Sequence, residues 1–319
     1  MARIAIVQQA PVVLDRDATV ARAAGWAAAA ARGGAGLVVF PEAFVPGYPS
    51  WMWRLRPGPE MALAEQIHAR LLAQALDLCA APHALEPLQQ AAREHGIAIV
   101  CGLHERDSQC SRSTLYNSVV VIGGDGELLN RHRKLMPTGP ERLVWGFGDA
   151  SGLRAVDTPA GRLGTLICWE NYMPQARLAL YGDGIEMLVA PTYDSGERWI
   201  ASAQHIAREG GCWVVGAGCV LQGRDLPRDL PGRAQLFPDD DEWINAGDSL
   251  VVAPGGRIVA GPLHEQRGLL FADIDLARVG VARRSLDVAG HYARPDLFAL
   301  QVDRRPQRLV SQPGDGTPR

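Results

Sequence analysis

Short apolar runs alternate with longer amphipathic stretches along most of the chain. Residues 36–40 form a continuous apolar run of the length expected for a strand buried on both faces. Residues 17–31 are Ala-rich and have the spacing of an amphipathic helix. The same criteria predict further strands at 3–7, 97–104, 116–122, 128–134, 153–157, 162–168, 187–190, 213–217, 248–253, 257–260 and 269–274. Further helices are predicted at about 59–79, 85–95, 175–181, 198–209 and 276–284.

Strands and helices alternate, but several predicted strands adjoin directly through glycine turns such as 123–126. This arrangement predicts an α/β protein with a mixed sheet rather than a purely parallel one. No linker or repeat interrupts the pattern, so residues 1–310 are predicted to form one domain. The segment 222–241, rich in Pro, Asp, Arg and Gly, is predicted to be a long polar loop with a functional or oligomer-contact role. Residues 311–319 are predicted to be a disordered tail.

The composition is that of an ordinary globular protein, since 47% of the 319 residues are hydrophobic and 21% are charged. A net charge of −3 provides no basic surface for nucleic acid or an anionic membrane. The N-terminus lacks the pattern of a signal peptide, and no run approaches the roughly 18 apolar residues needed to span a bilayer. We therefore expect a cytoplasmic protein without nucleic-acid or membrane partners.

The six cysteines are too sparse for a disulfide scaffold, and none belongs to a Cys-x-x-Cys pair. Cys101, His104 and Cys110 have metal-like spacing but supply only three ligands, so no tetrahedral zinc site is completed. Isolated side chains of this kind are more often packing residues, as is the simplest interpretation of Cys212 and Cys219. A metal-binding redox protein would need the ligand set that is missing. We predict no metal and no organic cofactor.

Cys168 stands where the apolar strand pattern of residues 163–167 breaks and a helical run follows. A thiol at a strand-to-helix turn points toward the unpaired N–H groups of the next helix, which together with the helix dipole favour the thiolate. The thiolate is the nucleophilic form, so this position suits covalent catalysis. The alternative is a small buried hydrophobic side chain, which is the commoner role of a free cysteine.

Two charged residues also lie at predicted strand ends, where α/β proteins usually place their chemistry. Glu42 follows the 36–40 run in a proline-rich loop, and a water-poor pocket there would raise its pKa toward that of a general base. Lys134 ends the predicted strand 128–134 and can hold a developing negative charge. Either side chain taken singly is more often a solvated surface group. With Cys168 they supply a nucleophile, a proton carrier and a charge stabiliser, and no His/Asp pair is needed.

Three sequence blocks around these residues resemble the Glu, Lys and Cys motifs of the nitrilase superfamily, in the same order and with similar spacing. They read Pro-Glu-Ala-Phe at 41–44, His-Arg-Lys-Leu at 132–135 and Cys-Trp-Glu-Asn at 168–171. The Cys-Trp-Glu triplet, with Pro-Gly-Tyr-Pro at 46–49, is similar to the nitrilase branch rather than to the amidase or carbamoylase branches. The resemblance covers roughly residues 1–300.

This resemblance implies an α-β-β-α sandwich that dimerises through helices into a longer stack and often grows into spiral oligomers. It also implies that Cys168 is the nucleophile, Glu42 the general base and Lys134 the stabiliser of the tetrahedral intermediate. Glu141 matches the second glutamate of the family, which helps to orient the substrate or the lysine. Gln175, where the branch usually has Leu, and a shorter C-terminal tail are departures from the family pattern.

We therefore predict a nitrilase that converts an organic nitrile to a carboxylic acid and ammonia. Still open are another C–N hydrolase of the same scaffold (an amidase, a carbamoylase or a cyanide-hydrolysing enzyme) and an inactive scaffold protein. The expected partners are the small-molecule nitrile and further copies of the chain, in a homodimer or a larger, spiral homo-oligomer. Trp169 can also stabilise an oxyanion through its backbone N–H. Aromatic residues that are candidates for the substrate pocket, and equally for the core, are Tyr48, Trp53, Trp145, Trp169, Tyr193 and Trp199.

Overall fold

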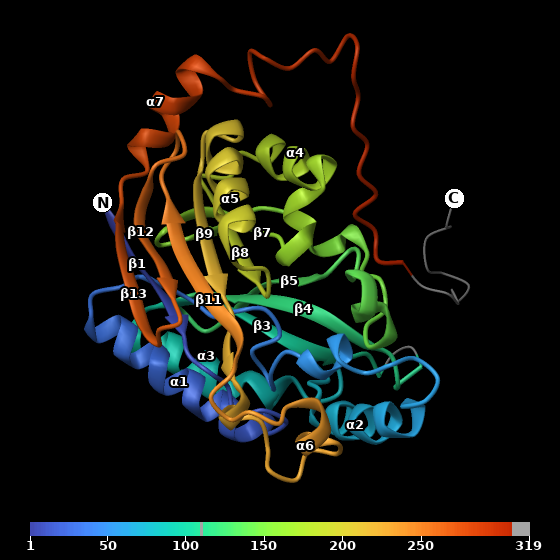
Figure 1. Ribbon diagram of the computed structural model, residues 1–319. Helices are drawn as coiled ribbons and strands as arrows, with labels where there is room; N and C mark the ends of the chain where they lie inside the picture. Colours follow the sequence, from blue (N-terminus) through green and yellow to red (C-terminus); the bar gives the residue numbers. More distant parts are fainter. Residues whose placement is uncertain (109–110, 308–319) are drawn as a thin grey trace.

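Two β-sheets pack face to face between two layers of helices in the computed structural model, which describes residues 1–108 and 111–307 (Figure 1). Within the first sheet, three neighbouring strands are parallel to one another, and every other pair of adjacent strands is antiparallel. In spatial order this sheet contains β13 (Gly268–Ile274), β1 (Ala2–Gln8), β2 (Leu37–Val39), β3 (Ala98–Arg106), β4 (Leu115–Ile122) and β5 (Leu128–Arg133).

The second sheet also mixes parallel and antiparallel pairs. Its spatial order is β10 (Val220–Gln222), β11 (Trp243–Val252), β9 (Trp213–Gly218), β8 (Met187–Thr192), β7 (Gly161–Thr165) and β6 (Val156–Thr158), and β12 (Ile258–His264) pairs with β11. Strands β7, β8 and β9 are parallel, and the other pairs are antiparallel. The predicted mixed α/β architecture is therefore confirmed, in the form of two sheets.

Helices cover the outer faces of both sheets. The first sheet is covered by α1 (Arg16–Arg32) and α3 (Glu86–His95), and the second by α4 (Pro174–Gly182) and α5 (Glu197–Glu209) (Figure 1). The remaining α-helices are α2 (Met61–Gln74), α6 (Arg233–Leu236) and α7 (Ala277–Ser285). Short 3-10 helices are η1 (Ser50–Trp53), η2 (Pro82–Leu85), η3 (Gly139–Leu143), η4 (Ala150–Gly152), η5 (Cys168–Tyr172) and η6 (Gly223–Asp225). The layers confirm the α-β-β-α sandwich.

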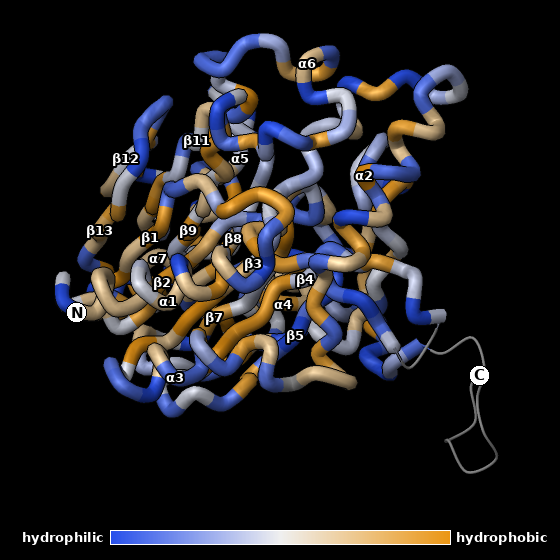
Figure 2. The backbone as a smooth tube through the Cα atoms, turned by 90° about the horizontal axis from the view of Figure 1, so that it is seen from below, coloured by the Kyte–Doolittle hydropathy of each residue, from blue (hydrophilic) through white to orange (hydrophobic). Residues whose placement is uncertain are grey.

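Each sheet is buried on both faces because it lies between the other sheet and a helix layer. In β1, Ile4 and Ile6 belong to the cluster between the sheets, whereas Ala5 and Val7 pack with the helices. Figure 2 accordingly shows hydrophobic colours along most of the strands and hydrophilic colours in many loops. Burying a large aliphatic side chain contributes about 1.5–3 kcal/mol. This double burial explains why the strands read as continuous apolar runs.

The segment 222–241, expected to be a long polar loop, is more ordered than its composition indicates. It contains the single turn of α6, and β11 begins at Trp243, earlier than predicted. Leu236 and Phe237 are buried in an apolar cluster that includes residues of α2. The segment is thus the long loop that was expected, with two short helical turns, and its buried side chains give it a core contact that its polar composition does not indicate. The tail expected to be disordered, 311–319, lies outside the described residues.

Within residues 1–108 and 111–307, no helix is long and apolar enough to cross a membrane.

Candidate active site

The three candidate catalytic residues follow the ends of strands from both sheets. Glu42 comes after β2, Lys134 after β5 and Cys168 after β7. Strands β2 and β5 belong to the first sheet and β7 to the second. All three side chains are buried. The fold therefore collects residues that are far apart in the sequence into one enclosed region.

The turn that carries the nucleophile candidate is tightly held. Cys168 has a φ of 53°, a left-handed conformation that is uncommon for a residue with a side chain and costs about 1–3 kcal/mol. The Asn171 side-chain amide donates to the carbonyl oxygens of Leu166 (3.0 Å) and Cys168 (2.8 Å). The Arg177 guanidinium donates to the Asn171 carbonyl oxygen at 2.6 Å. This turn ends β7 at Thr165, so the strand is shorter than predicted.

A buried ammonium group joins the two glutamates of the site. Lys134 Nζ donates to Glu42 Oε1 at 2.8 Å and to Glu141 Oε2 at 2.7 Å. Glu42 Oε1 also accepts from Asn117 Nδ2 at 2.7 Å, and Glu42 Oε2 accepts from the Tyr193 backbone N–H at 2.7 Å. Buried charges require this kind of pairing and hydrogen bonding. The Glu42 carboxylate is thus fixed by three donors.

Tyr48 connects this cluster to a group of aromatic rings. Its hydroxyl donates to Glu141 Oε1 at 2.7 Å and accepts from Trp53 Nε1 at 3.2 Å. Its ring stacks on that of Tyr193, with 3.6 Å between the ring centroids, and Trp145 approaches it edge-on at 5.7 Å. The structure therefore brings four of the predicted pocket residues together beside Glu141.

Trp169 and Trp199 have contrasting surroundings. Trp169 is 52% exposed, and its Nε1 donates to Asp194 Oδ2 at 3.0 Å, an oxygen that also accepts from the Tyr172 hydroxyl at 2.9 Å. These three residues line an open depression next to the nucleophile turn. Trp199 is instead fully buried in the core between the second sheet and its helices, close to Gly216. The expectation that Trp199 lines the pocket is corrected, because it lies on the face of α5 that packs against the sheet.

Burial and neighbouring charges shift the proton affinities of the cluster. Burial raises the pKa of Glu42, Lys134 opposes this, Glu141 adds to it, and the net shift is upward. The sequence-based expectation of a raised Glu42 pKa is therefore confirmed. Burial alone would lower the pKa of Lys134, but the neighbouring negative charges, chiefly that of Glu42, outweigh burial and raise it. Lys134 consequently remains protonated.

The Cys168 thiol also keeps its proton, which corrects the expectation of a resting thiolate. Burial raises the pKa of this thiol, and Glu42 raises it further, while Lys134 lowers it; Glu141 raises it and Thr192 lowers it to a smaller extent. Cys168 opens the short 3-10 helix η5 rather than a long α-helix. A few aligned peptide dipoles do not offset burial and two nearby carboxylates. The thiolate must therefore be generated by proton transfer.

Sequence patterns missed two partners of Glu42: the Asn117 side chain and the Tyr193 backbone N–H. The signal for Asn117 is its position as a polar residue within the otherwise apolar strand β4. No side-chain pattern identifies a backbone donor such as that of Tyr193. Cys219 lies in the core as predicted, and its Sγ also donates to the Glu42 carbonyl oxygen at 3.3 Å.

In the part of the chain that the structure describes, no three His, Cys, Asp or Glu side chains form a group able to hold a metal ion. His104 Nδ1 accepts from Trp145 Nε1 at 3.0 Å, and its Nε2 donates to the Gly47 carbonyl oxygen at 3.0 Å. Burial lowers the pKa of His104 to about 3. Both ring nitrogens are therefore engaged, which gives His104 a packing role. Cys110 lies outside the described residues.

Comparison with known proteins identifies the family to which this chain belongs. The carbon-nitrogen hydrolase family matches residues 3–284. The chain is 43% identical over 309 residues to an aliphatic nitrilase of Sinorhizobium fredii (strain HH103), covering 97% of both chains. It is 39% identical to the bifunctional nitrilase/nitrile hydratase NIT4A of Lupinus angustifolius, covering 97% of this chain and 88% of that one. The chain therefore belongs to the carbon-nitrogen hydrolase family.

Solved structures share the same fold. Nit3 of Saccharomyces cerevisiae, a member of branch 10 of the nitrilase superfamily, is similar with a TM-score of 0.66 and 20% identity, covering 91% of this chain and 96% of that one. An amidase from Nesterenkonia sp. AN1, with acrylamide joined to its active-site cysteine by Michael addition, has a TM-score of 0.65 and 22% identity. That comparison covers 90% of this chain and 100% of the amidase chain.

Proposed function

We propose that this chain is a nitrilase, which hydrolyses an organic nitrile with two waters to a carboxylic acid and ammonia. The buried cluster of Glu42, Lys134 and Glu141 around the Cys168 thiol carries this proposal. It combines a nucleophile, a proton acceptor and a fixed positive charge in one water-poor region. The 43% identical relative is named an aliphatic nitrilase, which supports a nitrile as the substrate.

In the first half of the reaction, the Cys168 sulfur adds to the nitrile carbon, and the thiol proton passes through Glu42 to the nitrile nitrogen. The product is a thioimidate. The raised pKa of Glu42 suits a group that first accepts and then returns a proton. The Lys134 ammonium stabilises the negative charge that develops on the substrate. The backbone N–H of Trp169 is a second candidate donor to that charge.

In the second half, water adds to the thioimidate carbon, the C–N bond breaks, and ammonia leaves a thioester on Cys168. Glu42 then takes a proton from the second water as that water attacks the thioester. The C–S bond breaks, the acid is released, and the sulfur regains its proton. Glu141 holds Lys134 in place throughout by accepting its second hydrogen bond, at 2.7 Å.

The aromatic residues supply the apolar walls that a nitrile substrate needs. Tyr48, Trp53, Trp145 and Tyr193 gather beside Glu141, and Trp169 follows the nucleophile directly. Aromatic and apolar surface of this kind binds the organic part of a small molecule, while a few fixed polar groups orient its reactive end. We assign the five residues to substrate binding.

The alternative functions would use the same catalytic residues. Cys168 would also attack an amide, a carbamoyl compound or cyanide, with Glu42 transferring protons and Lys134 stabilising the developing charge. The solved amidase structures support the fold only, at 22% identity. An inactive scaffold protein is disfavoured because Glu42, Lys134 and Cys168 are all present and buried, and Lys134 is hydrogen-bonded to Glu42.

The deciding experiment measures ammonia release from aliphatic, aromatic and arylacetonitriles, each run beside the matching amide. We expect the nitriles to be consumed, with the acid as the main product. Turnover of amides alone would move the chain to the amidase alternative. An absence of turnover on both panels would contradict the proposal.

A variant tests the nucleophile directly. Cys168→Ala is expected to lower kcat by about 10⁴-fold or more without altering the circular dichroism spectrum. Cys79→Ala is the matched control, because Cys79 is a free but exposed cysteine, and its activity should equal that of the wild type. Substantial residual turnover in Cys168→Ala would show that the sulfur is not the nucleophile.

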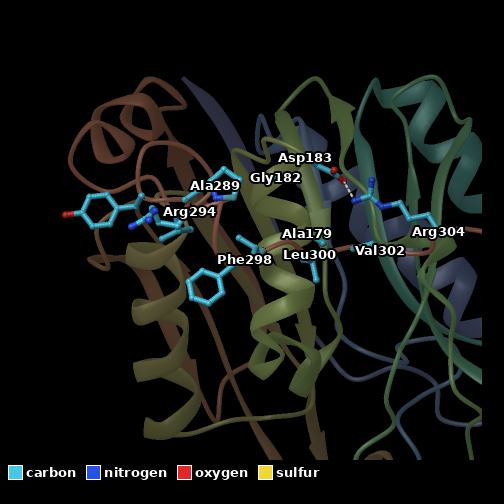
Figure 3. Close-up of a pocket in the computed structure, with 14 residues that line it drawn as sticks. Ala179, Gly182, Asp183, Ala289, Arg294, Phe298, Leu300, Val302 and Arg304 are labelled. Atoms are coloured by element: carbon cyan, nitrogen blue, oxygen red, sulfur yellow. Dashed lines mark hydrogen bonds and ion pairs between the residues drawn. The ribbon is translucent and has the colours of Figure 1, made fainter.

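The surface around α4 supports assembly into a homodimer or a larger, spiral homo-oligomer. Residues 288–304 pass over α4 and line with it an open groove of about 600 Å³ (Figure 3). Leu178, Phe298 and Leu300 expose large apolar side chains there. A second copy of the chain packed on this face would bury them. The single domain predicted for residues 1–310 and the cytoplasmic location stay predictions.

A further inference from the structure

Glu170 is a buried carboxylate that the reaction scheme does not use. Its side chain is almost inaccessible, and its Oε1 accepts from the Leu135 backbone N–H at 2.6 Å. Its Oε2 accepts from the Ile167 backbone N–H, also at 2.6 Å. His132 Nε2 lies 3.1 Å from both oxygens and donates to them. Two backbone N–H groups and one imidazole N–H therefore satisfy both oxygens of the buried Glu170 carboxylate.

The two backbone donors belong to the two catalytic segments. Leu135 directly follows Lys134 at the end of β5, in the first sheet, and Ile167 directly precedes Cys168 after β7, in the second sheet. Glu170 thus fastens the segment that carries the lysine to the turn that carries the sulfur. The hydrogen bonds of Glu170 with the Leu135 and Ile167 backbone N–H groups therefore connect the first sheet to the second.

Capping of η5 does not account for this arrangement. The bond from Ile167 to Glu170 is the local contact expected of a residue that caps the start of a helix. The contacts with Leu135 and His132 span 35 and 38 residues of the sequence and add nothing to the cap. Both Glu170 and His132 are shielded from water, which strengthens the interaction.

The other side of the nucleophile turn is fixed independently. Asn171 Nδ2 donates to the Cys168 carbonyl oxygen, and Arg177 of α4 donates to the Asn171 carbonyl oxygen. Arg177 is in turn paired with Glu209 of α5, with 2.8 Å between Nε and Oε1. With the turn anchored to the helices on this side, its separation from the first sheet depends on Glu170.

We propose that Glu170 is a positioning residue that sets the Cys168 sulfur relative to the Lys134 ammonium. The inference rests on the proposed roles of those two groups. A glutamine at this position has one acceptor oxygen, and its amide NH₂ would face a backbone N–H donor. At most one of the two backbone bonds would therefore survive in Glu170→Gln, and the two sheets would be less firmly joined at the site.

The test separates positioning from simple stability. Glu170→Gln is expected to lower kcat by about 100-fold, the cost of a misplacement of about 1 Å, with KM within about threefold of the wild type. Alkylation of Cys168 by iodoacetamide, followed by mass spectrometry of its peptide, is the second readout and needs no substrate. We expect it to slow by about tenfold, because the sulfur loses part of the Lys134 charge that favours the thiolate.

Glu105→Gln is the matched control. Glu105 is equally buried and accepts from Ser118, Arg131 and Arg133, but all of these lie within the first sheet. This variant should lose thermal stability while keeping kcat and the alkylation rate near those of the wild type. If Glu170→Gln behaves like this control, Glu170 is only structural and the inference is overturned. If Glu170→Gln does not fold, Glu170→Asp keeps the charge with a shorter reach, and the same split is expected.

Failure of the proposed function would look different. If the wild type turns over amides and no nitriles, the proposed substrate is wrong, but the effect on kcat is still measured with the amide. If alkylation of Cys168 leaves the wild-type enzyme active, the proposed nucleophile is wrong and the inference falls with it. Both results differ from an unchanged rate of Cys168 alkylation in Glu170→Gln, which would overturn only the inference about Glu170.

Discussion

Two carboxylates in the site share the positive charge of a single lysine. Lys134 bonds to both Glu42 and Glu141, so one negative charge is left without a cationic partner in the cluster. Burial raises the pKa of the Cys168 thiol, and forming its thiolate would also add another negative charge to this excess, so the pKa stays raised even with an ammonium nearby. Attack by the sulfur and uptake of its proton by Glu42 are therefore coupled.

At the scale of single residues, Tyr48→Phe tests the support of Glu141. The change removes the donor to Glu141 Oε1 but keeps the ring that stacks on Tyr193. A hydrogen bond to a charged group contributes about 1.5–3 kcal/mol, so kcat/KM should fall by about 10- to 100-fold in steady-state assays. Trp53→Phe, which removes only a bond to the Tyr48 hydroxyl, should cost less. An unchanged kcat/KM in Tyr48→Phe would contradict this role.

At the scale of elements, the strained turn before α4 depends on one side-chain amide. Asn171→Ala leaves the carbonyl oxygens of Leu166 and Cys168 without that donor in a buried region. The free energy of unfolding should fall by about 2 kcal/mol, measured by urea denaturation. Ser202→Ala, on the exposed face of α5, removes a side-chain bond to the helix backbone and should change it little. A change in Asn171→Ala as small as in this control would show that the turn is held by other means.

The start of α5 depends on a carboxylate from β11 and is expected to respond to pH. Asp248 accepts from the Gly196 N–H at 2.8 Å and pairs with His264 at 2.7 Å, and this hydrogen bond and charge raise the pKa of His264. The pKa of His264 is higher in the folded protein than in the unfolded chain, where it is about 6.5. The pair therefore stabilises the folded protein fully at a pH below about 6.5, and this stabilisation is lost as the pH rises through the folded pKa.

His264→Gln should therefore unfold at a slightly lower temperature than the wild type at about pH 5.5, and at nearly the same temperature at about pH 9. The difference will be small because His264 is mostly exposed. Thermal unfolding at the two pH values measures it. A difference that is equal at both would rule out the protonated pair as its source.

At the scale of the whole molecule, the apolar face over α4 predicts self-association. Sedimentation should give at least twice the 34.4 kDa chain mass for the wild type. Phe298 is the most exposed aromatic side chain of this face. Phe298→Ser replaces its ring with a small polar side chain and should shift the protein toward the monomer. Leu128→Ser alters an exposed residue of the first sheet and should leave the mass unchanged. A monomeric wild type would contradict the proposed assembly.

Most elements of this fold are predictable from local patterns. The continuous run at 36–40 and the Ala-rich stretch at 17–31 correspond to β2 and α1, because double burial and one-sided burial leave different periodicities. The order of strands within the two sheets is not predictable in this way. It depends on pairings between distant segments, such as β1 with β13. The apolar contacts hidden in 222–241 were missed because polar residues dominate that segment.

The identities of the candidate chemical groups are contained in the sequence, since Glu42, Lys134, Cys168 and Glu141 stand in recognisable blocks at strand ends. Their ionisation states are not, because burial and mutual charge decide whether the sulfur is a thiol or a thiolate. Trp169 and Trp199 cannot be told apart by residue type, yet Trp169 borders the nucleophile and Trp199 is buried in the core. Only the packing of the two sheets brings a glutamate, a lysine and a cysteine from separate strands within reach of one another, because contacts between distant segments depend on how the whole chain buries its apolar surface.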